Sequence, residues 1–128
     1  MGIIATDERE ISMYYNGESS FSEQALAILE ATEFKIRAVD ITKDKVTATQ
    51  WAEIADRLGV TGKDLVNTEH PNFIQSYGEH TNIESEEDWL KILSQNPKVI
   101  QGPILLHGER AFQAKALGDL FVFLDQES

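Results

Sequence analysis

Cysteine is absent from the 128-residue sequence. A chain without a thiol cannot form a disulfide, hold a metal through thiolates or use a cysteine as a nucleophile. The sequence also lacks long apolar runs, and its first residues do not combine a basic segment with an apolar one. We therefore expect no membrane contact, no secretory signal and a cytoplasmic location.

Basic residues are few. Asp and Glu together number 22 and Lys and Arg number 11, which gives a formal net charge of -11 at pH 7. Binding to DNA or RNA depends on neutralising phosphates with Lys and Arg, so we expect no nucleic acid partner. A free oxyanion would need a local basic pocket to overcome the negative field of the whole protein.

The length fits one domain spanning residues 1–128, and 41% hydrophobic residues are enough for a core. The first third of this domain predicts a β-α-β unit. Residues 10–15 and 34–41 are rich in strand formers. Between them, Ser20 and Glu23 have the spacing of a capping box at the start of an amphipathic helix. Such a unit implies two parallel strands joined by a right-handed crossover.

The middle of the chain predicts helices. A capping-box spacing at Thr47 opens a helix that Gly59 ends, and Ser85 opens a later one. Residues 61–66 indicate a short turn or helix. Residues 67–83 indicate a loop with one helical turn, because Pro, Gly and Asn interrupt any period. The inward faces of the two longer helices are expected to hold Trp51, Ile54, Ala55, Leu58, Trp89, Ile92 and Leu93.

The last part of the chain predicts a β-hairpin and a closing helix. Apolar residues 104–106 and the returning residues 110–112 flank the turn HGE. Residues 116–125 form an amphipathic helix, and its inward face is expected to hold Leu117, Leu120, Phe121 and Leu124. We therefore predict an α/β protein of thioredoxin-like fold: a four-stranded mixed sheet flanked by helices, with a helical insertion at about residues 47–98.

Four segments together resemble one known family. They are MYYN before the first helix, AEIADRLGVTGKDLV, NPKVIQGPILLHGERA and the closing amphipathic helix. On these segments, which cover nearly the whole chain, the sequence resembles the arsenate reductase (ArsC)/Spx family of thioredoxin-like proteins. The resemblance implies the ArsC-like form of this fold. From its Spx branch it implies a protein that acts by contacting other proteins.

The resemblance places Ser19 where the reductases carry their catalytic cysteine, three positions after the loop asparagine, which is Asn16 here. Gly17 stands where a Pro is usual, and Glu23 where an Arg is frequent. In the reductases a thiolate attacks arsenic and a second thiol releases it. A hydroxyl without an adjacent base can do neither. We expect no catalytic residue in this chain and favour a protein that is not an enzyme.

The oxyanion clamp of the reductases is missing as well. These proteins hold arsenate with arginines, and the resemblance assigns their positions to Asn67, to Gly102 and to Ala114 or Lys115. None of these residues is an arginine, so the nucleophile and the clamp are lost together. No metal site is expected either, because His70, Glu79 and His80 match no strong ligand spacing.

Five residues are candidates for ligand binding: Asn16, Ser19, Ser20, Gly102 and Pro103. The two serines either cap the first helix or help its free N–H groups to bind a polar or anionic group, such as a carboxylate of glutathione or of a peptide. The resemblance implies a cis peptide before Pro103 and backbone pairing of Gly102 with an extended peptide. The other interpretation is a rigid strand entry that only supports the fold.

Two hypotheses for function follow. The first is a redox-inactive ArsC/Spx-like protein that acts as a binding or regulatory module on a protein partner, without a cofactor. The second is an enzyme that binds glutathione or a thiol peptide, in which Ser19 orients a substrate thiol. The second hypothesis requires the candidate residues of the two loops to converge on one open pocket that Phe21 and Ile100 do not fill.

Overall fold

The computed structural model describes the backbone of residues 10–78 and 82–127. Four strands form one mixed sheet in the order β2-β1-β3-β4. Strand β1 pairs in parallel with β2 and antiparallel with β3, and β3 pairs antiparallel with β4. The bounds are Glu10–Tyr15 for β1, Lys35–Asp40 for β2, Ile104–His107 for β3 and Arg110–Gln113 for β4. The predicted thioredoxin-like sheet is confirmed.

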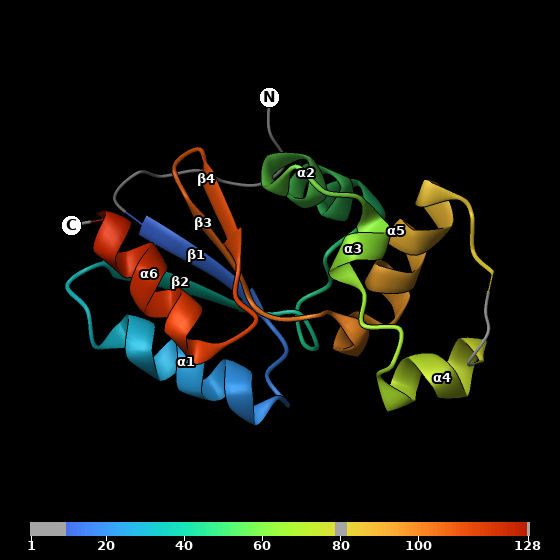
Figure 1. Ribbon diagram of the computed structural model, residues 1–128, viewed down its shortest axis with the longest axis horizontal. Coiled ribbons are helices and arrows are strands. Elements are labelled where there is room, and N and C mark those ends of the chain that lie inside the picture. Colours follow the sequence, from blue (N-terminus) through green and yellow to red (C-terminus); the bar gives the residue numbers. More distant parts are fainter. Residues whose placement is uncertain (1–9, 79–81, 128) are drawn as a thin grey trace.

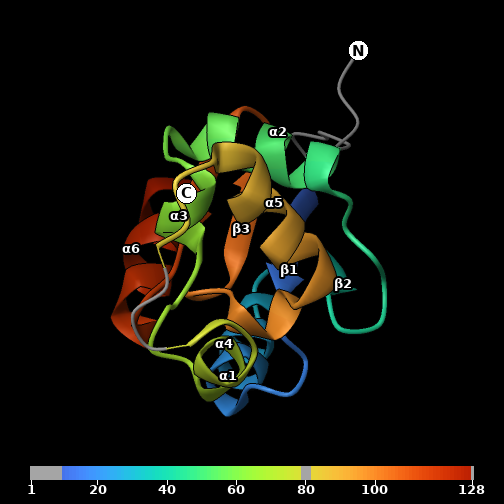
Figure 2. The ribbon, with the colours of Figure 1, turned by 90° about the vertical axis from the view of Figure 1, so that its right-hand side faces the viewer.

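Helices cover both faces of this sheet (Figure 1). They are α1 Ser20–Glu30, α2 Ala48–Leu58, α3 Gly62–Leu65, α4 Pro71–Tyr77, α5 Glu86–Gln95, the 3₁₀ helix η1 Pro97–Val99, and α6 Leu117–Glu127. Helices α1 and α6 lie together on one side, and α2, α3 and α5 lie on the other; the turned view places α5 in front of the strands (Figure 2). Within the described residues, none of the helices has the length and apolar character needed to cross a bilayer.

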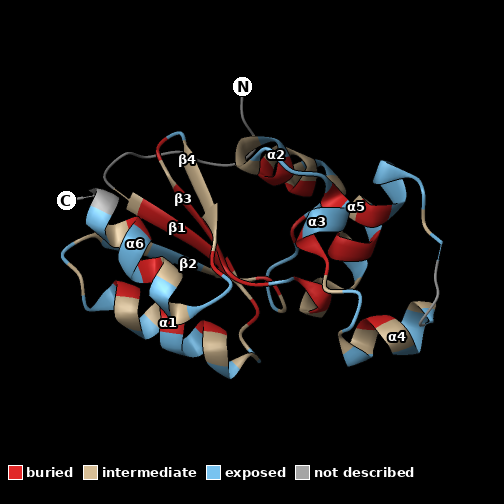
Figure 3. Ribbon diagram, viewed as in Figure 1, coloured by how far each residue is buried: buried red, intermediate tan, exposed pale blue. Residues whose placement is uncertain are grey.

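Side chains of the two central strands alternate between these faces. Ile11, Met13 and Leu105 pack with Ala25 and Leu29 of α1 and with Leu120 and Phe123 of α6. The neighbouring positions point the other way: Tyr14, Ile104 and Leu106 belong to the cluster that α2 to α5 build. The buried residues accordingly run through the middle of the sheet and along the inner sides of the helices (Figure 3). Burial on both faces explains why apolar residues occupy consecutive positions, as in Ile104, Leu105 and Leu106 of β3.

Helix α2 has the predicted caps at both ends. The Thr47 hydroxyl accepts the Gln50 N–H at 3.2 Å, and the Gln50 side chain accepts the Thr47 N–H at 2.9 Å. Gly59 ends the helix with a φ of 72°, in the left-handed region that glycine adopts without a Cβ clash. Trp51, Ile54 and Ala55 are buried as expected. Local sequence alone was sufficient to place this helix.

Helix α5 begins after Ser85 as predicted, but the cap is different. The Ser85 side chain makes no capping hydrogen bond. In the first turn, the Glu86 carboxylate instead accepts the N–H of Gly62 at 2.8 Å. An acidic run that suits the start of its own helix thus also ties α5 to the start of α3.

Helix α4 corrects the prediction of a loop with one helical turn. Seven residues, Pro71–Tyr77, are helical. Pro71 occupies the first turn, where its missing N–H costs nothing, and Nδ1 of His70 accepts the Asn72 N–H at 3.0 Å. Phe73 is buried and stacks on Trp89, with ring centroids 6.0 Å apart. Packing of this aromatic pair outweighs the weak helical pattern of the segment.

The predicted inward face of α6 is partly wrong. Phe121 is 58% exposed, whereas Phe123 is 1% exposed. Phe123 stacks on Phe112 at a centroid distance of 5.5 Å and lies beneath the Arg110 guanidinium at 4.6 Å. These two β4 residues rotate the buried face of the helix toward Phe123 and leave Phe121 in solvent.

A short ladder joins the helical insertion to the segment before β3. Val66 and Ile100 form an antiparallel bridge, flanked by bonds from Asn67 N–H to Val99 and from Gln101 N–H to Leu65, at 2.7 and 2.8 Å. The ladder fixes the chain on both sides of the candidate ligand residues. It also uses the backbone groups of both segments within the protein.

Candidate functional site

The loop between β1 and α1 folds as a tight turn around Asn16. The Asn16 side-chain oxygen accepts the Glu18 N–H at 2.9 Å, and its backbone oxygen accepts the Ser19 N–H at 3.0 Å. Only 8% of Asn16 is exposed. An asparagine stabilises such turns because its side chain reaches the backbone two residues further on. Asn16 therefore shapes the loop that presents Glu18 and Ser19.

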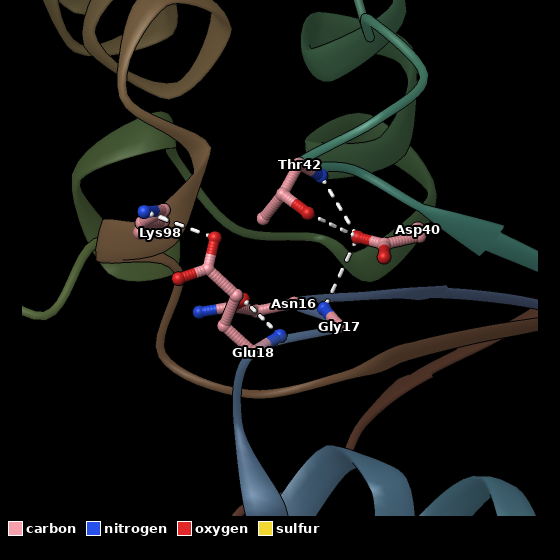
Figure 4. Close-up of polar contacts among 6 residues, drawn as sticks. All are labelled: Asn16, Gly17, Glu18, Asp40, Thr42 and Lys98. Carbon is pink, nitrogen blue, oxygen red and sulfur yellow. Dashed lines mark hydrogen bonds and ion pairs between the residues drawn. The ribbon is translucent and has the colours of Figure 1, made fainter.

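Asp40 at the end of β2 holds this loop from the neighbouring strand. One of its oxygens accepts the Gly17 N–H at 3.1 Å, the Thr42 N–H at 3.0 Å and the Thr42 hydroxyl at 2.6 Å (Figure 4). Burial acts to raise the pKa of Asp40, but the hydrogen bonds from Thr42 and Gly17 and the charge of Lys43 outweigh it, so the pKa is lowered. Asp40 is thus an ionised clamp on the loop.

Ser19 caps α1. Its backbone is extended, and its hydroxyl oxygen accepts the Ser22 N–H at 3.3 Å. Ser20 is the first helical residue and is exposed, so the predicted capping box of Ser20 and Glu23 is wrong by one position. The simpler of the two interpretations of Ser19, helix capping, is confirmed.

Glu18 is the nearest carboxylate to Ser19 in sequence, and it is engaged elsewhere. Its Oε2 lies 3.0 Å from Nζ of Lys98, in η1 (Figure 4). The two side chains are 59% and 41% exposed. Eighty positions separate these residues, and no local pattern marks the pair in the sequence. A general base for the Ser19 hydroxyl is therefore not supplied by Glu18.

The segment around Pro103 corrects one implication of the family resemblance. No peptide bond among the described residues is cis, so the implied cis bond before Pro103 is wrong. The Pro103 carbonyl accepts the Ala114 N–H at 2.9 Å and so extends the β3–β4 ladder by one pair. This extended pairing uses the trans form, which is also the intrinsically preferred one.

Gly102 is closely covered by its own chain. Its carbonyl accepts a hydrogen bond from the Gln113 side chain at 3.2 Å. A Cβ at this position would lie 2.1 Å from the backbone oxygen of Ala114. The glycine is therefore required by close packing against the end of β4. Its carbonyl already has a partner inside the protein, which disfavours the pairing with a bound peptide that we considered.

Three of the five candidate ligand residues share one cavity of about 200 Å³, which we call the Ser19 cavity. Asn16, Ser19 and Gly102 line it, whereas Ser20 and Pro103 do not. Phe21 and Ile100 form part of its wall and leave it open. The fold thus brings together two loops, as predicted. Their residues Asn16 and Gly102 are 86 positions apart in the sequence. Their role in binding stays a prediction.

Lys98 and His70 also line the Ser19 cavity, and the sequence did not single out either for this site. The structure gives His70 a local task, since its Nδ1 accepts the Asn72 N–H and caps α4. Lys98 is the residue that brings a full positive charge to the wall, and it is paired with Glu18. In the sequence it appeared only within the segment NPKVIQGPILLHGERA, which carries part of the family resemblance.

Two of the positions assigned to the arsenate-binding arginines do face this cavity. Asn67 and Gly102 both line it, and neither residue carries a guanidinium group. The Asn67 side-chain oxygen accepts the Glu69 N–H at 3.0 Å. Ala114 is buried beneath Gly102, and Lys115 lines a different cavity. The described lining of the Ser19 cavity contains no arginine.

Two of the three residues considered as metal ligands, Glu79 and His80, lie outside the residues that the structure describes. Across residues 10–78 and 82–127, no three histidine or acidic side chains gather as a metal site would require.

Comparison with known proteins identifies the fold. Neither the family models nor the curated proteins give a match. Among solved structures, an arsenate reductase from Vibrio cholerae matches with a TM-score of 0.77 at 14% identity, over 91% of this chain and 98% of that one. A Yersinia pestis protein provisionally named an arsenate reductase gives 0.76 at 18% identity, over 88% and 98%. An arsenate reductase (ArsC) related protein from Brucella melitensis gives 0.65 at 13% identity, over 94% and 98%. The chain has the thioredoxin-like fold of the ArsC structures.

Proposed function

We propose that this chain is a thiol-free member of the ArsC/Spx group, and that it acts as a redox-inactive binding or regulatory module on a cytoplasmic protein partner. The observation that carries the proposal is the helix-capping role of the Ser19 hydroxyl. At the place of the reductase cysteine stands a hydroxyl whose oxygen caps the first helix by accepting the Ser22 N–H.

The chemistry of oxygen supports the loss of redox activity. Reduction through thiols needs a thiolate that attacks and a second thiol that releases it, and the sequence has no sulfhydryl group. A serine becomes a nucleophile only beside a base. Glu18 is paired with Lys98, and Nδ1 of His70 is used by the cap of α4. These contacts favour a site that binds without reacting.

The electrostatics of the Ser19 cavity support the same proposal. A doubly charged oxyanion such as arsenate is normally held by several guanidinium groups, since these donate paired hydrogen bonds. Here Asn67 and Gly102 face the cavity, and its described lining holds a single lysine, Lys98, which contacts Glu18. The net charge of -11 adds a repulsive field.

Binding of glutathione or a thiol peptide is the second candidate, because Asn16, Ser19 and Gly102 share one cavity. Two observations weigh against it. The volume of about 200 Å³ is below the ~300–1,000 Å³ usual for small-molecule sites. The Gly102 carbonyl is bonded to Gln113, which leaves strand-like pairing with a peptide unsupported. Only a small part of such a ligand would enter.

A turnover assay tests the proposal. Purified protein is incubated with arsenate, glutathione and glutaredoxin, and separately with insulin and a thiol reductant. We expect neither arsenite nor insulin disulfide reduction above the rate without protein. Turnover in either assay would overturn the proposal.

A thermal-shift series with glutathione, arsenate and phosphate separates the two candidates. The leading candidate predicts no change in Tm with any of the three. A concentration-dependent rise with glutathione alone would favour the second candidate, since a ligand that binds only the folded state raises Tm by mass action. Stabilisation by arsenate would contradict both.

A further inference from the structure

Three cavities have lining residues in the segment from Lys98 to Gln101. Lys98 lines both the Ser19 cavity and a neighbouring cavity of about 330 Å³ that Glu18 and Thr42 also line. Gln101 lines both the Ser19 cavity and a third cavity of about 550 Å³, which Lys63 and Lys115 also line. The shared residues make these cavities neighbours, and we call the three cavities together the lysine track.

The lysine track reverses the sign of charge that dominates the chain. Its lining holds three lysines, Lys63, Lys98 and Lys115, against two carboxylates. The whole sequence has 22 acidic residues against 11 Lys and Arg. Within the part of the chain that the structure describes, Lys63 and Lys115 form no ion pair. In a strongly acidic protein such a place attracts negative groups selectively.

The two carboxylates of the track, Asp64 and Glu18, differ in how firmly they are held. Asp64 is held at the start of α3, where one of its oxygens accepts both the N–H and the hydroxyl of Thr61 at 2.9 Å. These bonds, with the charges of Lys63 and Lys115, lower the pKa of Asp64. Glu18 by contrast contacts Lys98 from an exposed loop position. An exposed ion pair is worth little, so another carboxylate can replace Glu18 on Lys98.

Several backbone groups along the track are already bonded within the protein. The Gln101 N–H is bonded to Leu65, and the Asn67 N–H to Val99. The Gly102 carbonyl is bonded to the Gln113 side chain. A bound segment would therefore be recognised through side-chain charge along the track, rather than through pairing with the sheet.

We propose that the lysine track binds an extended acidic segment of a partner protein, whose carboxylates contact Lys63, Lys98 and Lys115. This inference rests on the proposed binding function and names the chemistry of the partner. Nucleic acid is disfavoured as the occupant, because three lysines neutralise few phosphates and the rest of the protein repels a dense polyanion. On binding, a partner carboxylate replaces Glu18 on Lys98.

The test is a titration followed by ¹⁵N–¹H spectra of the labelled full chain. The probe is a blocked octapeptide of alternating Ser and Glu, and the matched probe has Gln in place of Glu. We expect saturable shifts at residues 63–68, 98–102 and 115 with the Glu peptide alone. The affinity should fall as salt rises from about 20 to about 200 mM, because exposed charges are screened over this range.

Two variants are expected to change the affinity for the Glu peptide in opposite directions. The double variant Lys63→Ala/Lys115→Ala should weaken binding about fivefold, as expected for two exposed ion pairs. Glu18→Gln should strengthen it about threefold by freeing Lys98. The matched control is Lys35→Ala/Lys91→Ala, which removes two exposed lysines outside the track.

Three results would overturn the inference: no shifts, equal shifts with the Gln peptide, or equal weakening by the control variant. The arsenate and insulin assays are separate measurements. A failed peptide titration without turnover would therefore reject the track and leave the thiol-free binding function to another surface. Turnover would reject the proposed function itself.

Discussion

Gly17 and Asp40 lie at the carboxyl ends of two adjacent parallel strands, and the Asp40 carboxylate accepts the Gly17 N–H at 3.1 Å. The approach is so close that a Cβ on Gly17 would lie 1.9 Å from Oδ2 of Asp40. The strand β2 thereby fixes the loop that carries Glu18 and Ser19. Glycine at this position has a steric reason independent of any catalytic role.

Replacing Gly17 by alanine tests this contact. Gly17→Ala should lower the free energy of unfolding by about 1–3 kcal/mol, because either Asp40 or the loop must move. The matched control is Gly118→Ala in α6, where a Cβ meets nothing within 4 Å. There alanine should stabilise the helix by about 0.5–1 kcal/mol. Urea unfolding of both variants gives the comparison, and equal effects would contradict the steric argument.

Acid should weaken the fold partly through Asp40. Its pKa is lowered from 3.8 in the folded state, because hydrogen bonds from Thr42 and Gly17 outweigh the effect of burial. A lowered pKa contributes stability that is complete above the unfolded-state value of 3.8 and is lost as the pH falls through the lower folded value. Unfolding free energies measured from about pH 6 down to about pH 2 should show this loss develop below the unfolded-state value. Asp40→Asn should flatten the slope, and an unchanged slope in this variant would contradict the role given to Asp40.

The two phenylalanines of α6 should respond differently to truncation. Phe123→Ala removes a buried ring that packs on Phe112 and Arg110, and should cost about 3–5 kcal/mol. Phe121→Ala, at a position 58% exposed, should change the stability by less than about 1 kcal/mol. Chemical denaturation measures both. A larger loss of stability for Phe121→Ala than for Phe123→Ala would show that α6 packs with the face that the sequence periodicity predicts.

The register of the α1 cap can be tested with two serines. Ser19→Ala removes the acceptor of the Ser22 N–H and should destabilise the protein by about 1 kcal/mol. Ser20→Ala, at the exposed first helical position, should stay within about 0.5 kcal/mol of the parent. The difference between the two unfolding midpoints is the measured quantity, and a reversed order would place the cap on Ser20.

Adding a thiol at the site should not create an arsenate reductase. Ser19→Cys supplies a nucleophile at the start of α1, where a thiolate is favoured. Asn67 and Gly102 still face the cavity in place of guanidinium groups. We expect the variant to react with a thiol reagent and to show no arsenite production with glutathione and glutaredoxin. Arsenite production by this variant would show that the clamp is dispensable.

The strands and longer helices could be predicted because their signals are local. Thr47, Gln50 and Gly59 mark the ends of α2 within the sequence itself, and the strand order then brings Asn16 near Gly102. The helix α4 was underestimated because Phe73 gains its stability from Trp89, sixteen positions away. Packing of this kind has no signature in the local pattern.

The electrostatics of the site depended on distant partners and could not be predicted. The Glu18–Lys98 pair joins a loop to a 3₁₀ helix eighty positions later, and two exposed side chains of opposite charge occur in many combinations. The peptide before Pro103 is trans, the intrinsically preferred form, where the resemblance implied a cis bond. The resemblance predicted the place of these residues and not their conformation.

The core shared by Tyr14, Ile104 and Leu106 with α2 to α5 has a consequence for protein engineering. A shortened chain that joins residue 46 to residue 99 would keep every strand and still leave one face of the sheet in water. The helical segment between them therefore cannot be removed without exposing the sheet. This segment and the sheet should unfold together, in a single cooperative calorimetric transition.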